Sequence, residues 1–449
     1  MVVDKKYVVM TALEILLGAA VVFWAVTVVA QKTGLEQMVG EVADISGKVK
    51  GDPTVESNQL NLKLNNLNFG GENIRGVIYV SGLPKYDIER GDTLTLRAKL
   101  GEGFGGFAAS LYAPEVLNVK KQEPRSLMLA WRETFATKVK NNLETKEAGL
   151  GLGYLMGMKN ELDEETQEMI RLVGLSHIIV ASGTHLGIIV EIVKKYFGRL
   201  SRFSGMLFSF LLVLGFGELI GWTASITRAA IVALVSLLAW YVGREIEAWR
   251  IILFAVVITL IIDPTNIVDL GWQMSFAAFF GVMVVAPRLT EFFYGKNPKA
   301  KPGVLAQTML ASLAATITCL PLLIYYYGTV SAISIFANVL ILPTMPLAMG
   351  LTFLTGLLGM MPAIWLFDVA QWLVNGTAKL VLDYHLFVME IFAQQKSFIL
   401  NFSQGKIWVL GLYLGIFLPI IFGSLLRAQK NRKKRVPKWE DSAILLPQK

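Results

Sequence analysis

The sequence predicts a polytopic α-helical membrane protein with a small soluble β domain near its N-terminus, and two observations predict this fold class. Of its 449 residues, 54% are hydrophobic and 17% are charged, with a mean hydropathy of +0.53, whereas a water-soluble domain carries about 25% charged residues. The apolar residues also form long runs outside residues 35–125. Since a helix needs about 20 apolar residues to cross a bilayer, we expect about 7–10 membrane segments.

The first segment, residues 1–34, is expected to be a transmembrane anchor. Residues 7–30 form an apolar run that follows Lys5 and Lys6. The run is longer than the core of a secretory signal peptide and contains Glu14, so we favour an uncleaved anchor over a cleaved signal. Because lysines favour the cytoplasmic side of a membrane, the N-terminus is expected inside and the next domain outside the cytoplasm.

Residues 35–125 have the alternating polar and apolar pattern of β-strands. The segments with this pattern and the turn signals between them are residues 61–65, 77–80 and 93–100, with Gly70-Gly71, Gly82-Leu83-Pro84 and Arg90-Gly91-Asp92. Several short strands at this spacing predict a five-stranded barrel of the OB type. Such barrels often bind oligonucleotides, although a fold by itself does not give a function.

Aromatic and basic side chains of this domain are candidates for contact with DNA, because bases stack on aromatic rings and phosphates attract cations. The main candidates are Lys85, Tyr86, Arg97 and Phe104, and Phe69, Tyr79 and Phe107 are further ones. More than half of these residues would also serve as core in any domain, so the alternative is a structural role.

After the barrel, residues 126–145 have the pattern of an amphipathic helix at the membrane surface. Residues 146–426 are expected to form the transmembrane domain, and residues 427–449 a basic cytoplasmic tail. The candidate spans are residues 176–193, 204–221, 224–242, 250–262, 270–286, 304–327 and 407–426. Residues 331–361 are broken by Pro343 and Pro346 into two possible half-helices, and residues 364–393 carry charges that suit either the interface or the bundle interior.

The distribution of positive charge predicts the orientation in the membrane. Residues 194–202, 288–303 and 427–438 are rich in Lys and Arg, and the predicted spans place all three on the same side as the N-terminus. We therefore expect a multi-pass protein of the cytoplasmic (inner) membrane with both termini in the cytoplasm and the barrel outside it.

Polar side chains are concentrated in one segment at membrane depth. Residues 174–187 contain Ser176, His177, Ser182, Thr184 and His185. Polar groups in lipid need partners and are usually found along a cavity. The segment therefore either lines a polar pathway or forms hydrogen bonds between closely packed helices.

Arg228 lies near the start of the span at 224–242. A guanidinium at the centre of a membrane helix costs about 2.5–3.5 kcal/mol, so it needs water, an anionic substrate, a carboxylate such as Asp269 or a place at the interface. Gln273 and Ser275 stand at the entrance of the next span, where they suit either substrate contact or helix capping.

These segments resemble the ComEC competence-protein family, whose members are inner-membrane channels for DNA uptake. The segment Gly174-Leu-Ser-His…Ala-Ser-Gly-Thr-His-Leu-Gly187 is similar to the family's hallmark. Further matches are the acidic residues 163–165, Thr227-Arg228-Ala229, Asp263-Pro264, Gly271-Trp-Gln-Met-Ser-Phe276, Leu320-Pro-Leu-Leu…Tyr327-Gly328 and Phe336-Ala-Asn-Val-Leu…Pro343. The resemblance extends over about residues 35–360, and Asn338 joins the pathway candidates through it.

Two features depart from the family pattern. Thr184 stands where the family commonly has Leu, which adds a hydroxyl group to the candidate pathway. Many members also carry a C-terminal metallo-β-lactamase-like domain, and no His-x-His-x-Asp-His cluster occurs in this sequence. Any nuclease that degrades the other strand is therefore expected to be a separate protein.

The resemblance implies a channel that passes single-stranded DNA into the cytoplasm during natural transformation. Its implied partners are an extracellular DNA receptor, a cytoplasmic helicase-type ATPase and the lipid bilayer. The chain itself has no Gly-x4-Gly-Lys-Ser/Thr loop for ATP, and its single cysteine, Cys319, allows no intramolecular disulfide and no cysteine-based metal site. We expect no enzymatic activity and no cofactor.

Two other functions are compatible with the sequence. One is a transporter or assembly factor for another anionic polymer or lipid. The other is an intramembrane serine hydrolase, with Ser182 as nucleophile and His185 or His385 as base. Ser182 and His185 are three residues apart and would share one face of a helix. Intramembrane serine proteases have Gly-x-Ser-Gly, and residues 180–183 lack the first glycine.

Overall fold

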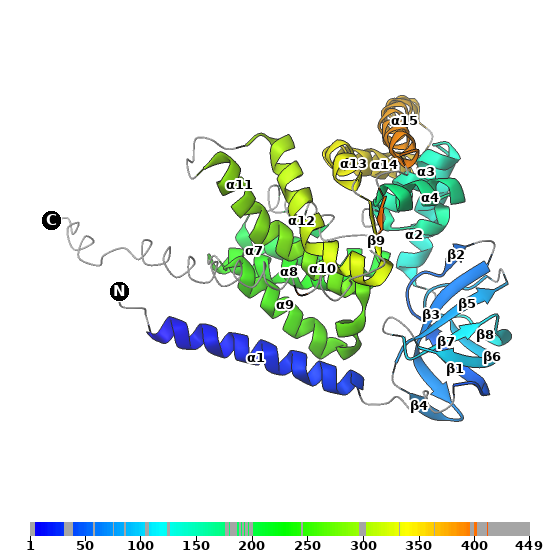
Figure 1. Cartoon of the computed structure of the whole chain (residues 1–449). Helices are drawn as coiled ribbons and strands as arrows, with labels where there is room; N and C mark the ends of the chain where they lie inside the picture. Colours follow the sequence, from blue (N-terminus) through cyan, green and yellow to red (C-terminus); the bar gives the residue numbers. More distant parts are fainter. Residues whose placement is uncertain are drawn as a thin grey trace, which may run out of the picture.

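The computed structural model describes most of the chain. The described residues are 5–30, 39–175, 201–395 and 399–401, except for short gaps at 57–58, 75, 85–86, 104–106, 124–125, 244–245, 296–301, 332 and 363, together with single positions between 176 and 200 and at 411. They form a β-barrel, a group of helices beside it, and a bundle of apolar helices that extends away from both (Figure 1).

The N-terminal segment is one helix, α1 (Lys5–Ala30), as the sequence predicts. It lies beside α9 (Ala248–Ile262), and the side chain of Leu253 approaches Gly18 at this contact. Glu14, the one charge within the apolar run of α1, accepts a hydrogen bond from Arg250 Nε at 3.1 Å. The carboxylate therefore has a cationic partner on the neighbouring helix, which lowers the cost of placing it on an apolar helix.

The soluble domain is a closed five-stranded barrel, which confirms the predicted OB-like fold. Its strands are β1 (Val42–Val49), β3 (Gln59–Phe69), β5 (Ile78–Leu83), β6 (Thr93–Glu102) and β7 (Ala109–Tyr112). They pair in the order β1-β3-β5-β7-β6, and β6 returns to β1 to close the barrel. Only β5 and β7 run parallel.

Alternation of side chains along the strands builds the barrel core. Leu64, Ile78, Leu94 and Leu111 are fully buried inside it, and the residues between them along each strand point outward. The turn signals also act as predicted, since Gly91, between β5 and β6, has a φ of 96° that favours glycine. Three short strands extend the sheet: β2 (Thr54–Glu56), β4 (Glu72–Ile74) and β8 (Glu115–Lys120).

A group of helices packs beside the barrel around one hydrophobic core. Its members are α2 (Leu127–Lys140), α3 (Thr145–Met156), η2 (Lys159–Glu161), α4 (Glu164–Val173), α13 (Ser334–Ile341), α14 (Met345–Gly359) and α15 (Trp365–Ala393). The apolar face of α2, which the sequence predicts for a membrane surface, is covered by α14 and α3, with Phe135 fully buried. Residues 331–361 form two helices, as the two prolines predict.

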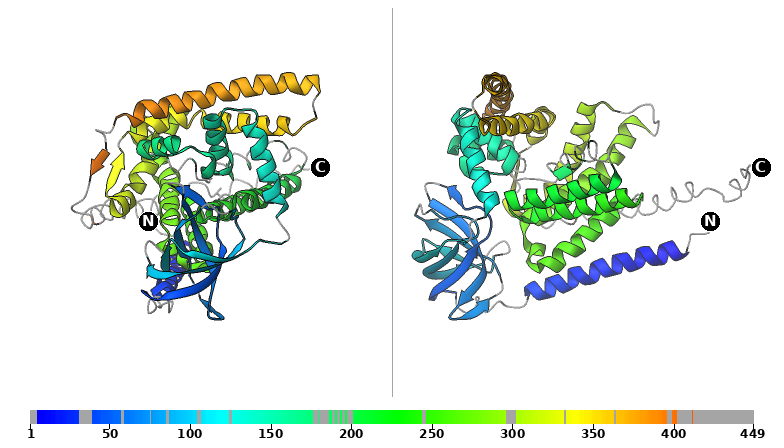
Figure 2. Two further views of the ribbon diagram at one scale, coloured as in Figure 1. Left: turned by 90° about the vertical axis from the view of Figure 1, so that its right-hand side faces the viewer. Right: turned by 180° about the vertical axis from the view of Figure 1, so that it is seen from behind.

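The charged segment 364–393 is a single long helix, α15. It packs on α14, α13, α4 and α3. Figure 1 shows α15 end-on and α1 lengthwise, whereas the quarter turn in Figure 2 shows α15 lengthwise. The helix α15 therefore lies crosswise to α1.

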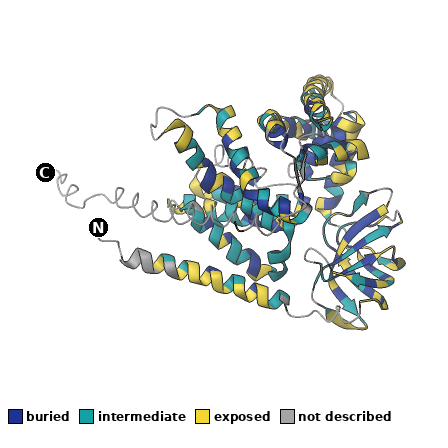
Figure 3. Ribbon diagram, in the orientation of Figure 1, coloured by how far each residue is buried: buried dark blue, intermediate teal, exposed yellow. Residues whose placement is uncertain are grey.

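The third part of the structure is the apolar helical bundle. It contains α7 (Arg202–Ile220), α8 (Ala224–Val242), α9, η3 (Pro264–Val268), α10 (Leu270–Phe280), the π-helical segment η4 (Gly281–Val285), α11 (Ala286–Tyr294) and α12 (Val304–Tyr327). Among the described residues, four helices are long and apolar enough to cross a membrane: 202–220, 225–242, 270–294 and 305–326. Many of their apolar side chains are exposed (Figure 3), as expected for helices surrounded by lipid.

Some predictions for the bundle cannot be compared with the structure. The predicted spans 176–193 and 407–426 and the basic tail fall almost entirely outside the described residues. The single cysteine, Cys319, is buried in α12, and its Sγ donates to the carbonyl oxygen of Met274 at 3.5 Å. A short strand β9 (Thr329–Ser331) follows α12 and pairs with β10 (Ile399–Asn401).

The barrel is attached to the helices by polar contacts on one side. Lys50 Nζ lies 3.3 Å from Asp263 Oδ2, directly after α9. Arg90 Nη2 donates to the carbonyl oxygen of Glu218 at 2.7 Å, in the last turn of α7. Asp52 pairs with the buried Arg132 of α2 at 2.6 Å. The barrel therefore meets the C-terminal ends of α7 and α9, and α1 ends on the same side (Figure 1).

Candidate nucleic-acid interface

Two aromatic rings and a lysine meet on the outer surface of β3 and β5. Lys63 of β3 and Tyr79 of β5 are direct cross-strand partners. The ring of Phe107, from the connection between β6 and β7, lies 5.3 Å from the ring of Tyr79. Lys63 Nζ lies 5.3 Å above the centre of the Phe107 ring. We call Lys63, Tyr79 and Phe107 the barrel face.

The barrel face occupies the surface that OB barrels use for oligonucleotides. In the order of the closed barrel, β3 and β5 are the second and third strands, and Phe107 belongs to the connection between the fourth and fifth. These are the strands and one of the loops that contact nucleic acid in this fold. Rings for stacking and a cation for phosphate are the groups that such binding needs.

Of the predicted barrel residues, the structure brings Tyr79 and Phe107 together. Lys63 is a member that the sequence analysis missed, although the alternation in residues 61–65 marks it as outward-facing on a strand. Phe69, at the end of β3, packs against the barrel core. Lys85, Tyr86 and Phe104 lie outside the described residues, so their predicted role stays a prediction.

Arg97 lies on another part of the barrel surface and is engaged in an ion pair. Its Nε and Nη2 donate to the two carboxylate oxygens of Asp44 at 2.6 and 2.7 Å, and the two residues are cross-strand partners on β6 and β1. The hydrogen bonds from Arg97 lower the pKa of Asp44, and those to Asp44 raise the pKa of Arg97. The local charge of Arg97 is therefore balanced.

The second candidate region surrounds Arg228 inside the bundle. Thr223 caps the N-terminus of α8, and Arg228 follows in the second turn with only 7% of its surface exposed. Its Nη1 donates to the carbonyl oxygen of Ser275 on α10 at 2.9 Å. The rings of Phe276 and Phe279 lie 5.7 and 5.2 Å from the guanidinium carbon.

The charge of Arg228 is not matched by a carboxylate. No ion pair joins Arg228 to an acidic side chain in the part of the chain that the structure describes, and its Nε is buried without a hydrogen-bond acceptor. Carbonyl oxygen and aromatic faces partly stabilise a guanidinium, but they leave its formal charge uncompensated. A buried cation of this kind is suited to meet a mobile anion.

The residues next to this region mainly build the connection between α9 and α10. Asp263 caps η3, and Asp269 accepts from Trp272 N at 2.7 Å as the N-cap of α10. Asp269 thus caps a helix, and no ion pair with Arg228 is found among the described residues. Gln273 Nε2 donates to the carbonyl oxygen of Ile267 at 2.8 Å. This contact ties η3 to α10, so Gln273 has a local structural partner beside any role in a pathway.

The remaining pathway candidates lie on another helix or outside the described residues. Asn338 is 4% exposed on α13, which packs against α12 and α15, and its Oδ1 has no hydrogen-bond partner among the described residues. Ser176, His177, Ser182, Thr184 and His185 lie outside the described residues, and their predicted role is untested.

His385, a candidate base for the alternative hydrolase function, is a core residue. It is fully buried on α15, with its Nε2 2.7 Å from Thr344 Oγ1 and its ring 5.5 Å from that of Tyr154. Burial lowers the pKa of His385 to about 4. The imidazole is therefore neutral near pH 7 and packs like an apolar ring with one hydrogen bond.

Comparisons with known proteins agree with the resemblance seen in the sequence. The chain is 23% identical over 218 residues to ComE operon protein 3 of Bacillus subtilis (strain 168), and the aligned part covers 48% of this chain and 27% of that protein. The chain thus covers about a quarter of that relative. No solved structure matches it. The family described as Competence protein matches residues 154–427, which is more than half of the chain, and the chain belongs to this family.

Proposed function

We propose that the protein carries single-stranded DNA across the cytoplasmic membrane into the cell during natural transformation. Membership of the competence family supports a role in DNA uptake. The barrel face supports contact with a single strand before it enters the membrane, because two adjacent rings and a lysine suit bases and phosphates. In this proposal the protein is a conduit and performs no chemical step.

The observation that carries the proposal is the unmatched charge of Arg228. A strand with one negative charge for each nucleotide cannot enter hydrocarbon, so its path must be wet and carry a few cations. Arg228 sits one turn inside a membrane helix, near the barrel end of the bundle, without a carboxylate partner in the described structure. A guanidinium donates two parallel hydrogen bonds to phosphate oxygens. The Nε–H of Arg228 has no acceptor among the described residues and can donate one of them.

The proposed path needs other proteins at both ends. A receptor outside the cell would deliver DNA to the barrel, and a helicase-type ATPase in the cytoplasm would pull the strand. A separate nuclease would remove the other strand where it is degraded. The orientation in the proposal has the barrel outside and both termini inside, which follows from the basic loops.

The test compares Arg228→Gln and Arg228→Lys in a transformation assay, with uptake divided by the amount of protein in the membrane. We expect Arg228→Gln to reduce uptake per molecule at least about tenfold, since a charge-assisted contact contributes about 1.5–3 kcal/mol. Arg228→Lys should recover part of the activity, because it keeps the charge and loses the paired hydrogen bonds.

Arg171→Gln is the matched control. Arg171 has the same charge and pairs with Glu168 on the exposed surface of α4, so its loss should leave uptake unchanged. Normal uptake per molecule in Arg228→Gln would refute the role of Arg228 in the path. A lower amount of protein with normal uptake per molecule would identify it as a structural residue only.

A further inference from the structure

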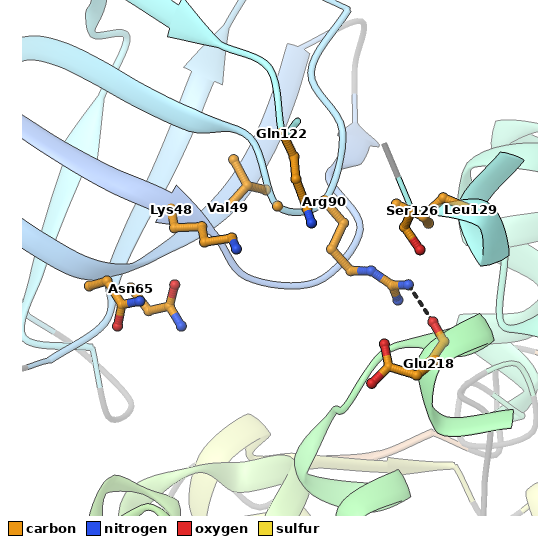
Figure 4. Close-up of a pocket in the computed structure, with 10 residues that line it drawn as sticks. Lys48, Val49, Asn65, Arg90, Gln122, Ser126, Leu129 and Glu218 are labelled. Carbon is orange, nitrogen blue, oxygen red and sulfur yellow. Dashed lines mark hydrogen bonds between the residues drawn. The ribbon is translucent and has the colours of Figure 1, made fainter. Parts of the chain in front are cut away.

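A cavity of about 360 Å³ lies between the barrel and the end of α7. Its barrel side is formed by Lys48, Asn65, Arg90 and Gln122, and Glu218 of α7 closes the opposite side (Figure 4). The lining is therefore mostly polar, with two cations and three amides, Asn65, Asn66 and Gln122, facing one acidic residue. The volume is large enough for a phosphate group with part of an attached sugar or for several waters.

Two buried polar atoms at this cavity lack hydrogen-bond partners among the described residues. They are Arg90 Nη1 and Asn65 Oδ1. The other end of the guanidinium is held, because Arg90 Nη2 donates to the carbonyl oxygen of Glu218. Unpaired buried polar groups cost about 1–3 kcal/mol each, so a ligand that offers hydrogen bonds here is favoured.

The positive charges of the cavity are not cancelled by its acidic residue. Lys48 is exposed and forms no ion pair in the described part of the chain. Glu218 has one carboxylate oxygen engaged, since Oε1 accepts from Trp222 Nε1 at 2.8 Å, and it contacts Arg90 through its backbone. Lys48 and Arg90 together exceed Glu218 by one positive charge, which favours an anionic ligand.

The cavity lies next to the barrel face along β3. Asn65 and Lys63 are two residues apart on β3 and so project on the same side of the strand. The cross-strand partner of Asn65 is Lys48 on β1, just as that of Lys63 is Tyr79 on β5. A strand that stacks on Tyr79 and Phe107 would therefore pass Lys63 and Asn65 and reach the cavity at the end of α7.

We propose that this cavity binds a phosphodiester group of the single strand at the point where the strand leaves the barrel for the membrane helices. The inference rests on the proposed function and adds the place and the residues of the transfer. Phospholipids contain the same phosphodiester chemistry. The position of the cavity next to the barrel face favours the nucleic acid, because a lipid headgroup would gain nothing from the aromatic pair.

The test measures binding of a fluorescent 20-nucleotide oligothymidylate to the full chain in nanodiscs, by anisotropy over a range of salt concentrations. Lys48→Gln removes the exposed cation, and Asn65→Asp places a negative charge in the cavity with almost no change of shape. We expect each to weaken binding about three- to tenfold, and Lys48→Gln to reduce the slope of log K against log salt by about 0.7.

Lys120→Gln and Asn118→Asp are the matched controls. Both residues are exposed on β8, which pairs with β6 and lies outside the cavity lining, and the controls repeat the two chemical changes. They should bind the oligonucleotide like the wild type. Measurements in phosphatidylcholine alone and with added phosphatidylglycerol separate the two sources of phosphodiester.

Several outcomes would overturn the proposal. If the cavity holds a lipid phosphate, both cavity variants will bind the oligonucleotide like the wild type in phosphatidylcholine, and native mass spectrometry will show that they retain less phosphatidylglycerol. If Tyr79→Ala weakens binding while both cavity variants do not, the transfer site is wrong and the proposed function stands. If the wild type does not bind the oligonucleotide, both proposals are wrong.

Discussion

Arg228 and His385 are both buried ionisable residues, and each meets burial in a different way. Arginine keeps its proton under all physiological conditions, so the carbonyl oxygen of Ser275 and two aromatic rings have to stabilise the charge. Histidine can release its proton, and His385 contributes a neutral ring to the core beside Thr344. Arg228 therefore remains charged when buried and can bind an anion, whereas His385 is buried as a neutral ring.

The state of His385 predicts a dependence of stability on pH. Its pKa is about 4 in the folded chain and about 6.5 when unfolded. Between these values the unfolded chain binds a proton that the folded chain does not, so stability decreases as the pH falls from about 6.5 to about 4, by up to about 3 kcal/mol. His385→Gln should show a smaller decrease. Thermal melts in detergent at pH 7.5 and 5.0 measure it.

The wild type and His385→Gln have to be compared, because Glu147 changes the stability in the opposite direction as the pH falls. Burial and a hydrogen bond with Asp383 raise the pKa of Glu147, so the folded chain binds this proton more readily and gains stability as the pH falls. That contribution is the same in wild type and His385→Gln and cancels in the difference. Equal loss of stability in both proteins would contradict the assignment to His385.

At the scale of the element, the sequence predicts single strands and helices better than it predicts contacts between distant segments. The alternation in residues 61–65 and 93–100 predicted β3 and β6, because one face of each strand lies in the core. Phe107 reaches Lys63 and Tyr79 only because β7 pairs with β5 across the barrel, and no local pattern carries that information. The position of α15 was left open, since its charges suit two environments. The structure packs Leu382, His385 and Met389 inward, at the three- and four-residue spacing of one helix face.

The barrel should fold alone, because its core is formed by residues 43–111 without helical side chains. We expect residues 39–122 to give a β-type circular dichroism spectrum with a cooperative melt, and to bind oligothymidylate.

Tyr79→Ala or Phe107→Ala should weaken binding at least about fivefold, since one stacked base contributes about 1–3 kcal/mol. Lys63→Gln should reduce the salt dependence, whereas Lys99→Gln on β6 should not. A folded barrel whose affinity is unaffected by either aromatic substitution would show that the barrel face is not used.

At the scale of the whole molecule, the barrel and the crosswise helix α15 lie at one end of the apolar bundle (Figure 2). The chain runs towards that end in α1, α7 and α9 and away from it in α8, because Lys50 and Arg90 of the barrel contact residues after α9 and in the last turn of α7. Arg228, in the second turn of α8, and the cavity at the end of α7 are both close to the barrel end.

This arrangement predicts which segments a reagent can reach from outside the cell. Cys319 is buried and is the only cysteine, so Cys319→Ala gives a background without thiols. In this background, Glu72→Cys places a thiol on the exposed strand β4 of the barrel. Asn297→Cys places one in a basic loop, and Asn431→Cys places one in the basic tail.

A membrane-impermeant maleimide should label Glu72→Cys in intact cells. It should label the other two variants only after the membrane is opened, since Lys- and Arg-rich segments stay in the cytoplasm. Labelling of Asn431→Cys in intact cells would place the tail outside, and equal labelling of Glu72→Cys and Asn297→Cys would contradict the direction of the helices on which the proposed path depends.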